Sequence, residues 1–339
     1  MAFEGPGGII MATRELPLEM ARPEWAWRAV RVAGVVAVVV LVTLLLIAPA
    51  PTLGWTWNLV VPLLPATFLI SPAIWRNVCP LATLNELPDR WGIGQRLPGG
   101  AVASGAIAMA LLALLIPARR LILNTNGEVF AAAIVVLALL AVGLGMVFAA
   151  RSGFCNGVCP VLPVERLYGQ HPLLQIRGSR CASCTFCTPR GCIDLVRGKA
   201  TAQMLGRSRH TWRWLFTPTG VFAAAFPGLV LGYFTTADVS GGISLAPFGV
   251  AAAYALASFA LVGAVVFATR LEAALALTLL GAVAFALYYW FAAPSIADQI
   301  GLGSGASWAI RIVSWGLLVT WLLKARPFRS ARPAAQSPR

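Results

Sequence analysis

Long apolar stretches separated by short polar segments dominate the chain from residue 29 onward. A helix that crosses the hydrocarbon core of a bilayer needs roughly 20 predominantly apolar residues. Eight stretches meet this requirement, and we predict membrane-spanning helices over 29–50, 55–75, 99–117, 129–150, 214–236, 246–269, 271–293 and 304–323. At the turn around Arg270, the alternative to two separate spans is one long bent hairpin.

The polar segments divide the chain into five parts. The N-terminal segment, 1–28, is too long and too polar for a cleaved secretory signal, so we interpret it as a cytoplasmic segment. A first membrane half (29–150) precedes a long polar loop (151–213), a second membrane half (214–323) and a basic tail (324–339). The pattern predicts an all-α integral membrane protein of about eight transmembrane helices with a small cytoplasmic cap.

Composition supports this class. Of the 339 residues, 59% are hydrophobic and 11% charged, and the mean hydropathy is +0.79. A soluble globular protein carries about 25% charged residues. A disordered chain has few aromatic residues, whereas this chain has 12 Trp and 16 Phe. Both classes are therefore excluded.

The formal net charge of +14 raises the question of a nucleic-acid partner, which the distribution of charge answers. With the N-terminus in the cytoplasm, alternation of the spans places all but six charged residues on the cytoplasmic side. The exceptions are Arg119, Arg120, Arg311, Glu128, Asp238 and Asp298. The outer side is then neutral, as the positive-inside rule requires. We expect membrane lipid, and no nucleic acid, as the partner, with both termini in the cytoplasm.

All seven cysteines fall in the predicted cytoplasmic loops or at the helix ends that enter them: Cys79, Cys155, Cys159, Cys181, Cys184, Cys187 and Cys192. The cytosol is reducing, so disulfides do not explain this clustering. Four of the cysteines form the run C-x2-C-x2-C-x4-C, close to the ferredoxin run that binds a [4Fe–4S] cluster. Zinc is the alternative, although structural zinc usually takes two separated cysteine pairs. The extra residue before Cys192 leaves open whether this cysteine binds the same cluster.

A second cysteine pattern lies at the ends of two predicted spans. Cys155, Cys159 and Pro160 form C-x3-C-P after the fourth span, and Cys79-Pro80 repeats it after the second, with Trp75 in place of the first cysteine. The repeat predicts two similar helix hairpins. If they pack together, Cys79, Cys155 and Cys159 converge on a possible second cluster, completed by Cys192 or by a non-cysteine group. The alternative is a packed Cys79 beside a redox-active dithiol of Cys155 and Cys159.

These motifs resemble those of the polytopic membrane ferredoxin-like iron–sulfur proteins of the NapH, NosR and CcoG type. The resemblance covers roughly residues 55–195 and rests on the C-x3-C-P motif, its degenerate copy and the run from Cys181 to Cys192. One C-x3-C-P copy has lost its first cysteine, and only one ferredoxin run is present where relatives often have two. The resemblance implies a bacterial inner-membrane iron–sulfur electron carrier.

Other cofactors find less support. His171 and His210 lie outside the predicted spans, so neither could bind a haem inside the bilayer. The sequence also contains no flavin or nucleotide fingerprint. Arg311, inside the eighth span, is a candidate for holding a quinone headgroup or pairing with a partner subunit; snorkelling to the interface is the alternative.

Basic and aromatic residues suggest contacts at the membrane surface. The basic run predicts an anchor to anionic lipid headgroups or a docking patch for an acidic ferredoxin-like donor; it comprises Arg207, Arg209 and Arg213, with Trp212 and Trp214. An aromatic set near the eighth span predicts an interfacial belt: Tyr288, Tyr289, Trp290, Trp308, Trp315 and Trp321.

Together these patterns predict a membrane-bound electron-transfer protein, a subunit of an oxidoreductase system. It would pass single electrons between a cytoplasmic donor and a membrane quinone or a partner redox subunit, in a direction that the sequence does not fix. Two alternatives remain: a metal-reducing maturation factor for a respiratory metalloenzyme, and a structural subunit of a larger energy-converting complex.

Overall fold

The computed structural model describes residues 24–90, 105–148, 153–174, 205, 208–209, 211–239 and 244–325. The helical elements follow in the order α1 (Glu24–Ile47), α2 (Pro49–Trp55), η1 (Thr56–Val60), α3 (Val61–Ile70), α4 (Pro72–Val78), α5 (Pro80–Glu86), η2 (Leu87–Arg90), α7 (Ala106–Ala118), η3 (Arg119–Leu123), α8 (Gly127–Val147), η4 (Phe154–Val158), α9 (Leu162–Tyr168), η8 (Trp212–Phe216), α11 (Pro218–Thr235), α12 (Ala246–Thr269), α13 (Ala273–Gln299) and α14 (Ser304–Ala325). Of the short elements, η1, η3 and η4 are π-helical and η2 and η8 are 3₁₀-helical.

Within the described residues, eight helical stretches are long and apolar enough to cross a membrane, which confirms the all-α class and the number of predicted spans. They run over Arg28–Ile47, Pro49–Ile70, Ala106–Leu123, Gly127–Val147, Pro218–Thr235, Ala246–Thr269, Ala273–Gln299 and Ser304–Ala325. The predicted ferredoxin-like cap falls on residues outside the described ranges.

Several predicted span boundaries are wrong, mostly next to proline. The first span ends at Ile47 because Ala48 precedes Pro49 and is not helical, and Pro49 opens the second span. That second span ends at Ile70, since Ser71 is extended (φ −165°, ψ 115°) before Pro72. The third and seventh spans were predicted to end at residues 117 and 293, but α7 continues past Pro117 through η3 to Leu123, and α13 continues past Pro294 to Gln299.

The turn at Arg270 separates two helices rather than bending one. Arg270 adopts the left-handed conformation (φ 53°, ψ 39°) directly after α12. A non-glycine residue in this region ends a helix, because the chain can no longer continue the α-helical path. The prediction of two spans is therefore confirmed.

Large apolar side chains cover the outer faces of several spans. Leu256 on α12 and Val313 on α14 expose 68% and 72% of their surfaces, and Val36 and Val39 on α1 are similarly exposed. In water such extensive apolar surface would have to find a partner, whereas lipid chains cover it without loss. This exposure, together with span length, is the signature of a multi-pass membrane protein.

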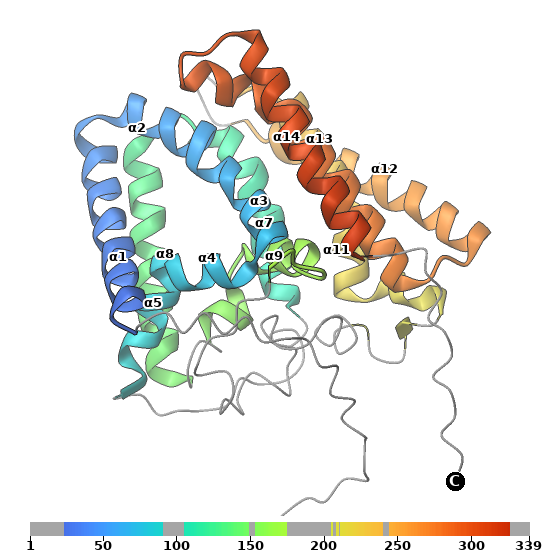
Figure 1. Ribbon diagram of the computed structural model, residues 1–339, viewed down its shortest axis with the longest axis horizontal. Coiled ribbons are helices and arrows are strands. Elements are labelled where there is room, and N and C mark those ends of the chain that lie inside the picture. Colours follow the sequence, from blue (N-terminus) through green and yellow to red (C-terminus); the bar gives the residue numbers. More distant parts are fainter. Residues whose placement is uncertain are drawn as a thin grey trace, which may run out of the picture.

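The helices pack in two groups (Figure 1). In one, α1 lies beside α8 and the small cluster of Leu45, Leu53 and Ala131 joins them to α2. In the other, α11 packs against α12 and α13, and α14 lies along α13. The main core joins α3 and α7 to this second group through Phe68, Leu69 and Met109. The core thus crosses between the first and second halves of the chain.

Hydrogen bonds between distant segments of the chain mark the two ends of the bundle. At the end that carries the cysteines, here called the cysteine end, Trp321 Nε1 donates to the Tyr168 carbonyl at 3.1 Å and Lys324 Nζ to the Leu173 carbonyl at 2.7 Å. At the other end, here called the opposite end, Asn58 Nδ2 donates to Gln299 Oε1 at 3.3 Å. At both ends, therefore, contacts join segments that lie more than 100 residues apart in the sequence.

Candidate functional site

The two Cys-Pro motifs have the same backbone conformation. Cys79 has φ −59° and ψ 119°, and Cys159 has φ −58° and ψ 118°. A residue before proline avoids the α region, so each cysteine ends one helical segment, and a short helix, α5 or α9, follows within a few residues. This agreement supports the interpretation of the two segments as copies of one hairpin.

Close helix contacts hold the first copy in place. A Cβ on Gly34 of α1 would lie 2.6 Å from the carbonyl oxygen of Val78, the residue before Cys79. Gly145 of α8 lies against the Asn85 backbone, and Asn85 Nδ2 donates to the Ala141 carbonyl at 2.8 Å. Glycine at these two positions lets α1 and α8 approach the backbone on either side of Cys79, whose side chain is buried.

A buried ion pair joins the two copies. Arg76 Nε lies 2.6 Å from Glu165 Oε1, and the two side chains expose only 9% and 6% of their surfaces. Arg76 stands three residues before Cys79, and Glu165 six residues after Cys159. In the second copy Asn156 takes the position of Arg76, and in the first copy Asn85 takes the position of Glu165; both asparagines are also buried. The ion pair thus links the Cys79 and Cys159 motifs by an interaction that is costly to break.

The thiol of Cys159 lies in an environment that disfavours its charged form. Desolvation by burial is the largest cause, and the neighbouring Cys79 thiol adds to it, so the pKa of Cys159 rises from 9.0 to about 12. The backbone N–H groups of Val161 and Leu162 point at the thiol and act in the opposite direction. In the metal-free chain, Cys159 is a neutral thiol at physiological pH, close enough to Cys79 for the two to interact electrostatically.

The structure does not gather the predicted second ligand set into a metal site. Cys155 lies in η4, one π-helical turn before Cys159, and both are partly buried. Among the described residues, no three His, Cys, Asp or Glu side chains are placed to hold a metal ion. Cys79, Cys155 and Cys159 thus form no metal group by themselves within the described residues, and a second cluster completed by Cys192 or by a non-cysteine group stays a prediction. The run Cys181, Cys184, Cys187 and Cys192 lies outside the described residues, so its cluster stays a prediction.

Arg311 has a structural role that sequence reasoning missed. Pro294 in α13 has no N–H to donate to the Trp290 carbonyl, four residues earlier. Arg311 donates to this carbonyl through Nε and Nη2, at 3.2 and 2.9 Å, and its guanidinium lies over the rings of Trp290 and Trp308. Arg311 thus satisfies a carbonyl that a proline leaves open, at the opposite end from the cysteines.

The aromatic and basic predictions divide between core and surface. Trp290 stacks on Trp315 near the surface, but Trp321 and Tyr289 are buried in the core, so not all of the predicted belt is interfacial. In the basic run, Trp214 is fully buried and donates to the Leu271 carbonyl, which rules it out as a lipid anchor.

The exposed part of the basic run comprises Arg209, Arg213 and Trp212. A contact of this part with lipid or with a donor protein stays a prediction. His171 packs beside Trp321, while His210 and Arg207 lie outside the described residues.

Sequence reasoning also missed the Arg76–Glu165 ion pair. The signal was present, because both residues stand at fixed offsets from the two Cys-Pro motifs in a chain with few charges. Their pairing, however, joins positions 89 residues apart and depends on how the two hairpins pack.

The fold and composition indicate a multi-pass membrane protein, with eight helices in its described part that are long and apolar enough to span a membrane. Comparisons with protein-family models, with curated proteins and with solved structures found no match. The functional argument therefore rests on the cysteine motifs and on the geometry around them.

Proposed function

We propose that this protein is a membrane-bound iron–sulfur electron carrier. Its [4Fe–4S] cluster would be held by Cys181, Cys184, Cys187 and Cys192, and would supply one-electron redox chemistry. The single observation that carries the proposal is the spacing C-x2-C-x2-C-x4-C in a chain whose described part spans a membrane eight times. Electrons would pass between a donor at the cysteine end and a membrane quinone or a partner redox subunit.

The anchoring of the described residues on both sides of the cysteine run supports this proposal. Before the run, the Leu173 and Leu174 N–H groups donate to the carbonyls of Leu69 and Ile70, at 2.9 and 2.7 Å. After the run, Leu205 is 4% exposed and belongs to the main core. The described residues on both sides of the four cysteines therefore pack against the bundle, where they would hold a small cap at both of its ends.

The number of clusters follows from the same residues. The run supplies four thiolates, which is a complete set for one cubane. Cys79 and Cys159 are near each other at the same end, but with Cys155 they make no metal group within the described part of the chain. One cluster is therefore our proposal, and a second would need ligands from beyond the described residues.

The orientation of the protein is also part of the proposal. With alternating spans, all Lys and Arg except Arg119, Arg120 and Arg311 fall on the side of the cysteines, and by the positive-inside rule that side would be the cytoplasm. We propose the inner membrane of a bacterium, with the termini and all seven cysteines on the cytoplasmic side. The exposed Arg209 and Arg213 would then face an acidic electron donor or anionic lipid.

Iron and acid-labile sulfide analysis of the full-length protein, purified without oxygen, tests the proposal. We expect about four iron atoms and about four sulfides per chain. Cys184→Ala should remove most of both, while Cys159→Ala, the matched control outside the run, should keep them. A stoichiometric amount of zinc in place of iron would refute the proposal, and about eight iron atoms would refute the single-cluster form of it.

A further inference from the structure

A polar cavity of about 170 Å³ lies at the opposite end of the bundle, among side chains from η1, η3, α11 and α13. Trp57 and Asn58 come from η1, Arg119 from η3, and Tyr233 from the end of α11, while α13 supplies Ser295. The π-helical segments η1 and η3 belong to different spans, and both line this one cavity. π-Helical segments are rare and frequently occur at functional sites. The presence of two of them in its wall therefore indicates that this cavity is a candidate binding site.

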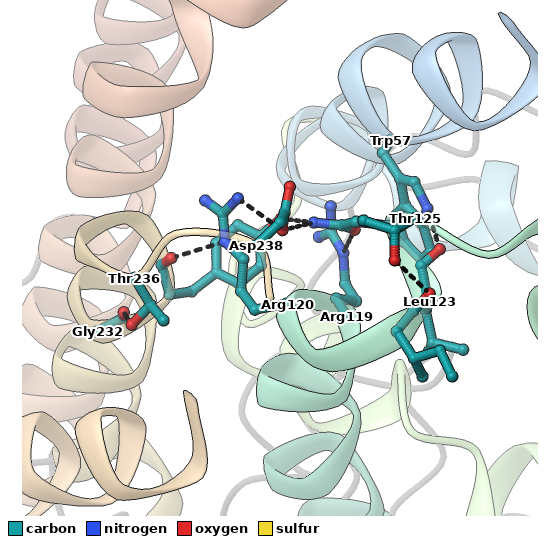
Figure 2. Close-up of polar contacts among 11 residues, drawn as sticks. Trp57, Arg119, Arg120, Leu123, Thr125, Gly232, Thr236 and Asp238 are labelled. Carbon is teal, nitrogen blue, oxygen red and sulfur yellow. Dashed lines mark hydrogen bonds and ion pairs between the residues drawn. The ribbon is translucent and has the colours of Figure 1, made fainter. Parts of the chain in front are cut away.

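The charges on the cavity wall do not balance. Arg120 Nη1 lies 3.1 Å from Asp238 Oδ1 (Figure 2). Asn124 Nδ2 donates to the same carboxylate oxygen at 2.8 Å. Arg119 makes no ion pair in the part of the chain that the structure describes; its Nε donates to Asn124 Oδ1 at 3.4 Å. Two guanidinium groups thus share one carboxylate, which leaves the cavity with one surplus positive charge.

Aromatic rings hold the Arg119 guanidinium in place. Its Cζ lies 3.9 Å from the Trp57 ring centroid and 4.6 Å from that of Tyr233. The Trp57 ring is itself fixed, because Nε1 donates to the Leu123 carbonyl at 2.9 Å (Figure 2). Cation–π contacts stabilise the charge only partly. A guanidinium at the end of a span that is held by ring faces, with one weak hydrogen bond, presents its remaining N–H donors to a ligand.

The size and place of the cavity narrow the choice of ligand. Pockets that take whole drug-sized molecules measure roughly 300–1,000 Å³, so a smaller group fits here. The cavity lies where the spans end, near turns that contain Asn124 and Asp238, which is the level of lipid headgroups. Guanidinium groups recognise the oxygens of phosphates and carboxylates through charge-assisted hydrogen bonds.

We propose that this cavity binds an anionic phosphate group, with Arg119 as the main ligand-binding residue. The group would belong to the headgroup of an anionic phospholipid or would be a free phosphate ion. The Asn58 amide and the Ser295 hydroxyl line the same cavity and supply further hydrogen bonds. The site lies at the opposite end from the cysteines and does not depend on the cluster.

The test uses the full-length protein in nanodiscs of neutral phosphatidylcholine. The lipid probe is spin-labelled phosphatidylglycerol, whose immobilised fraction is measured by EPR against spin-labelled phosphatidylcholine. The ion probe is inorganic phosphate, whose binding is measured by ³¹P NMR. We expect Arg119→Gln to lower the affinity for the phosphate probe that binds the wild type by roughly tenfold, because the variant loses one charge-assisted hydrogen bond. Arg311→Gln, at the same end but away from the cavity, should leave that affinity unchanged.

A second variant guards against misfolding of Arg119→Gln. Ser295→Phe fills the cavity and leaves the Arg119 contacts intact, and it should abolish the same binding. Selective binding of phosphatidylglycerol identifies a lipid site, and binding of inorganic phosphate alone identifies an ion site. The proposal is overturned if both probes bind the wild type and the Ser295→Phe variant equally, or if neither phosphate probe binds the wild type better than the neutral lipid does.

Discussion

At the scale of single residues, Arg76 and Glu165 are two charged side chains that the fold has removed from solvent. Attraction within a buried pair offsets the cost of desolvating both groups, so removal of one partner leaves the other charge buried without its ion-pair partner. We expect Arg76→Met to lower the free energy of unfolding by about 3–5 kcal/mol. The measurement is denaturant-induced unfolding of the protein in detergent.

A double variant separates the pair from its surroundings. Arg76→Met combined with Glu165→Leu removes both charges, and it should be more stable than Arg76→Met alone. Equal instability of the single and double variants would show that the ion pair does not connect the two Cys-Pro hairpins energetically.

The Cys159 thiol gives a pH-dependent prediction for the metal-free protein. Its pKa of about 12, raised by burial and by Cys79, leaves only on the order of one molecule in 10⁴ as thiolate at pH 8. Iodoacetamide should therefore modify Cys159 far more slowly in the folded protein than in the unfolded chain, as measured by peptide mass spectrometry. Modification at the unfolded rate would contradict the placement of this thiol.

The sign of the linked stability follows from the same pKa. Between pH 9 and pH 12 the unfolded chain loses the Cys159 proton and the folded chain keeps it. The contribution of this group to folding therefore decreases as the pH rises through that window.

At the level of elements, Gly145 determines how closely α8 approaches α5. A methyl group there would collide with the Asn85 carbonyl, whereas at Gly143 on the same helix it would meet nothing within 4 Å. We expect Gly145→Ala to destabilise the protein by about 1–3 kcal/mol, because α8 must move away from the Cys79 hairpin. Gly143→Ala, the matched control, should be neutral or stabilising. Equal effects of the two in thermal unfolding would contradict this packing.

Tyr289 hydrogen-bonds to the backbone of α3. Its hydroxyl accepts from the Ala66 N–H at 3.2 Å and donates to the Pro62 carbonyl at 2.5 Å. Tyr289→Phe leaves both groups without this partner, and we expect a loss of about 1–3 kcal/mol in the free energy of unfolding. Tyr254→Phe, at a half-exposed site on α12, should have no such effect.

The sequence was sufficient to predict the elements that depend on local hydrophobicity. Eight apolar stretches produced eight spans, because a bilayer imposes the same length and polarity on each of them. Proline positions were harder to interpret, since Pro49 and Pro72 mark breaks while Pro117 and Pro294 lie within continuing helices. The difference comes from tertiary partners, such as Arg311 for the Trp290 carbonyl, which no local pattern reveals.

The candidate sites could be predicted to a similar extent. The repeat at Cys79 and Cys159 was visible in the residues and reappears in matching backbone angles. The cavity around Arg119 was not predicted, because its walls combine residues from η1, η3, α11 and α13. In the sequence, Arg119 was used only as one of the charges that predict the orientation. Its contacts with the rings of Trp57 and Tyr233 depend on the three-dimensional arrangement.

At the scale of the whole molecule, the proposed orientation predicts which end a membrane-impermeant reagent reaches. Gly303 lies in the exposed turn between α13 and α14, at the opposite end, with open space around it. In intact cells, a charged maleimide should label Gly303→Cys but leave the native cysteines unlabelled until the membrane is permeabilised. Labelling of the native cysteines alone would show that the orientation is the reverse of the proposed one.

Electron transfer is the central claim about the whole molecule, and potentiometric EPR of anaerobic membranes that contain the full-length protein tests it most directly. We predict a signal that appears on reduction and disappears on oxidation in a single one-electron step. That signal should be lost in Cys184→Ala and kept in Cys159→Ala. A wild-type protein that gives no reducible iron–sulfur signal, or one whose signal survives in Cys184→Ala, would contradict the account.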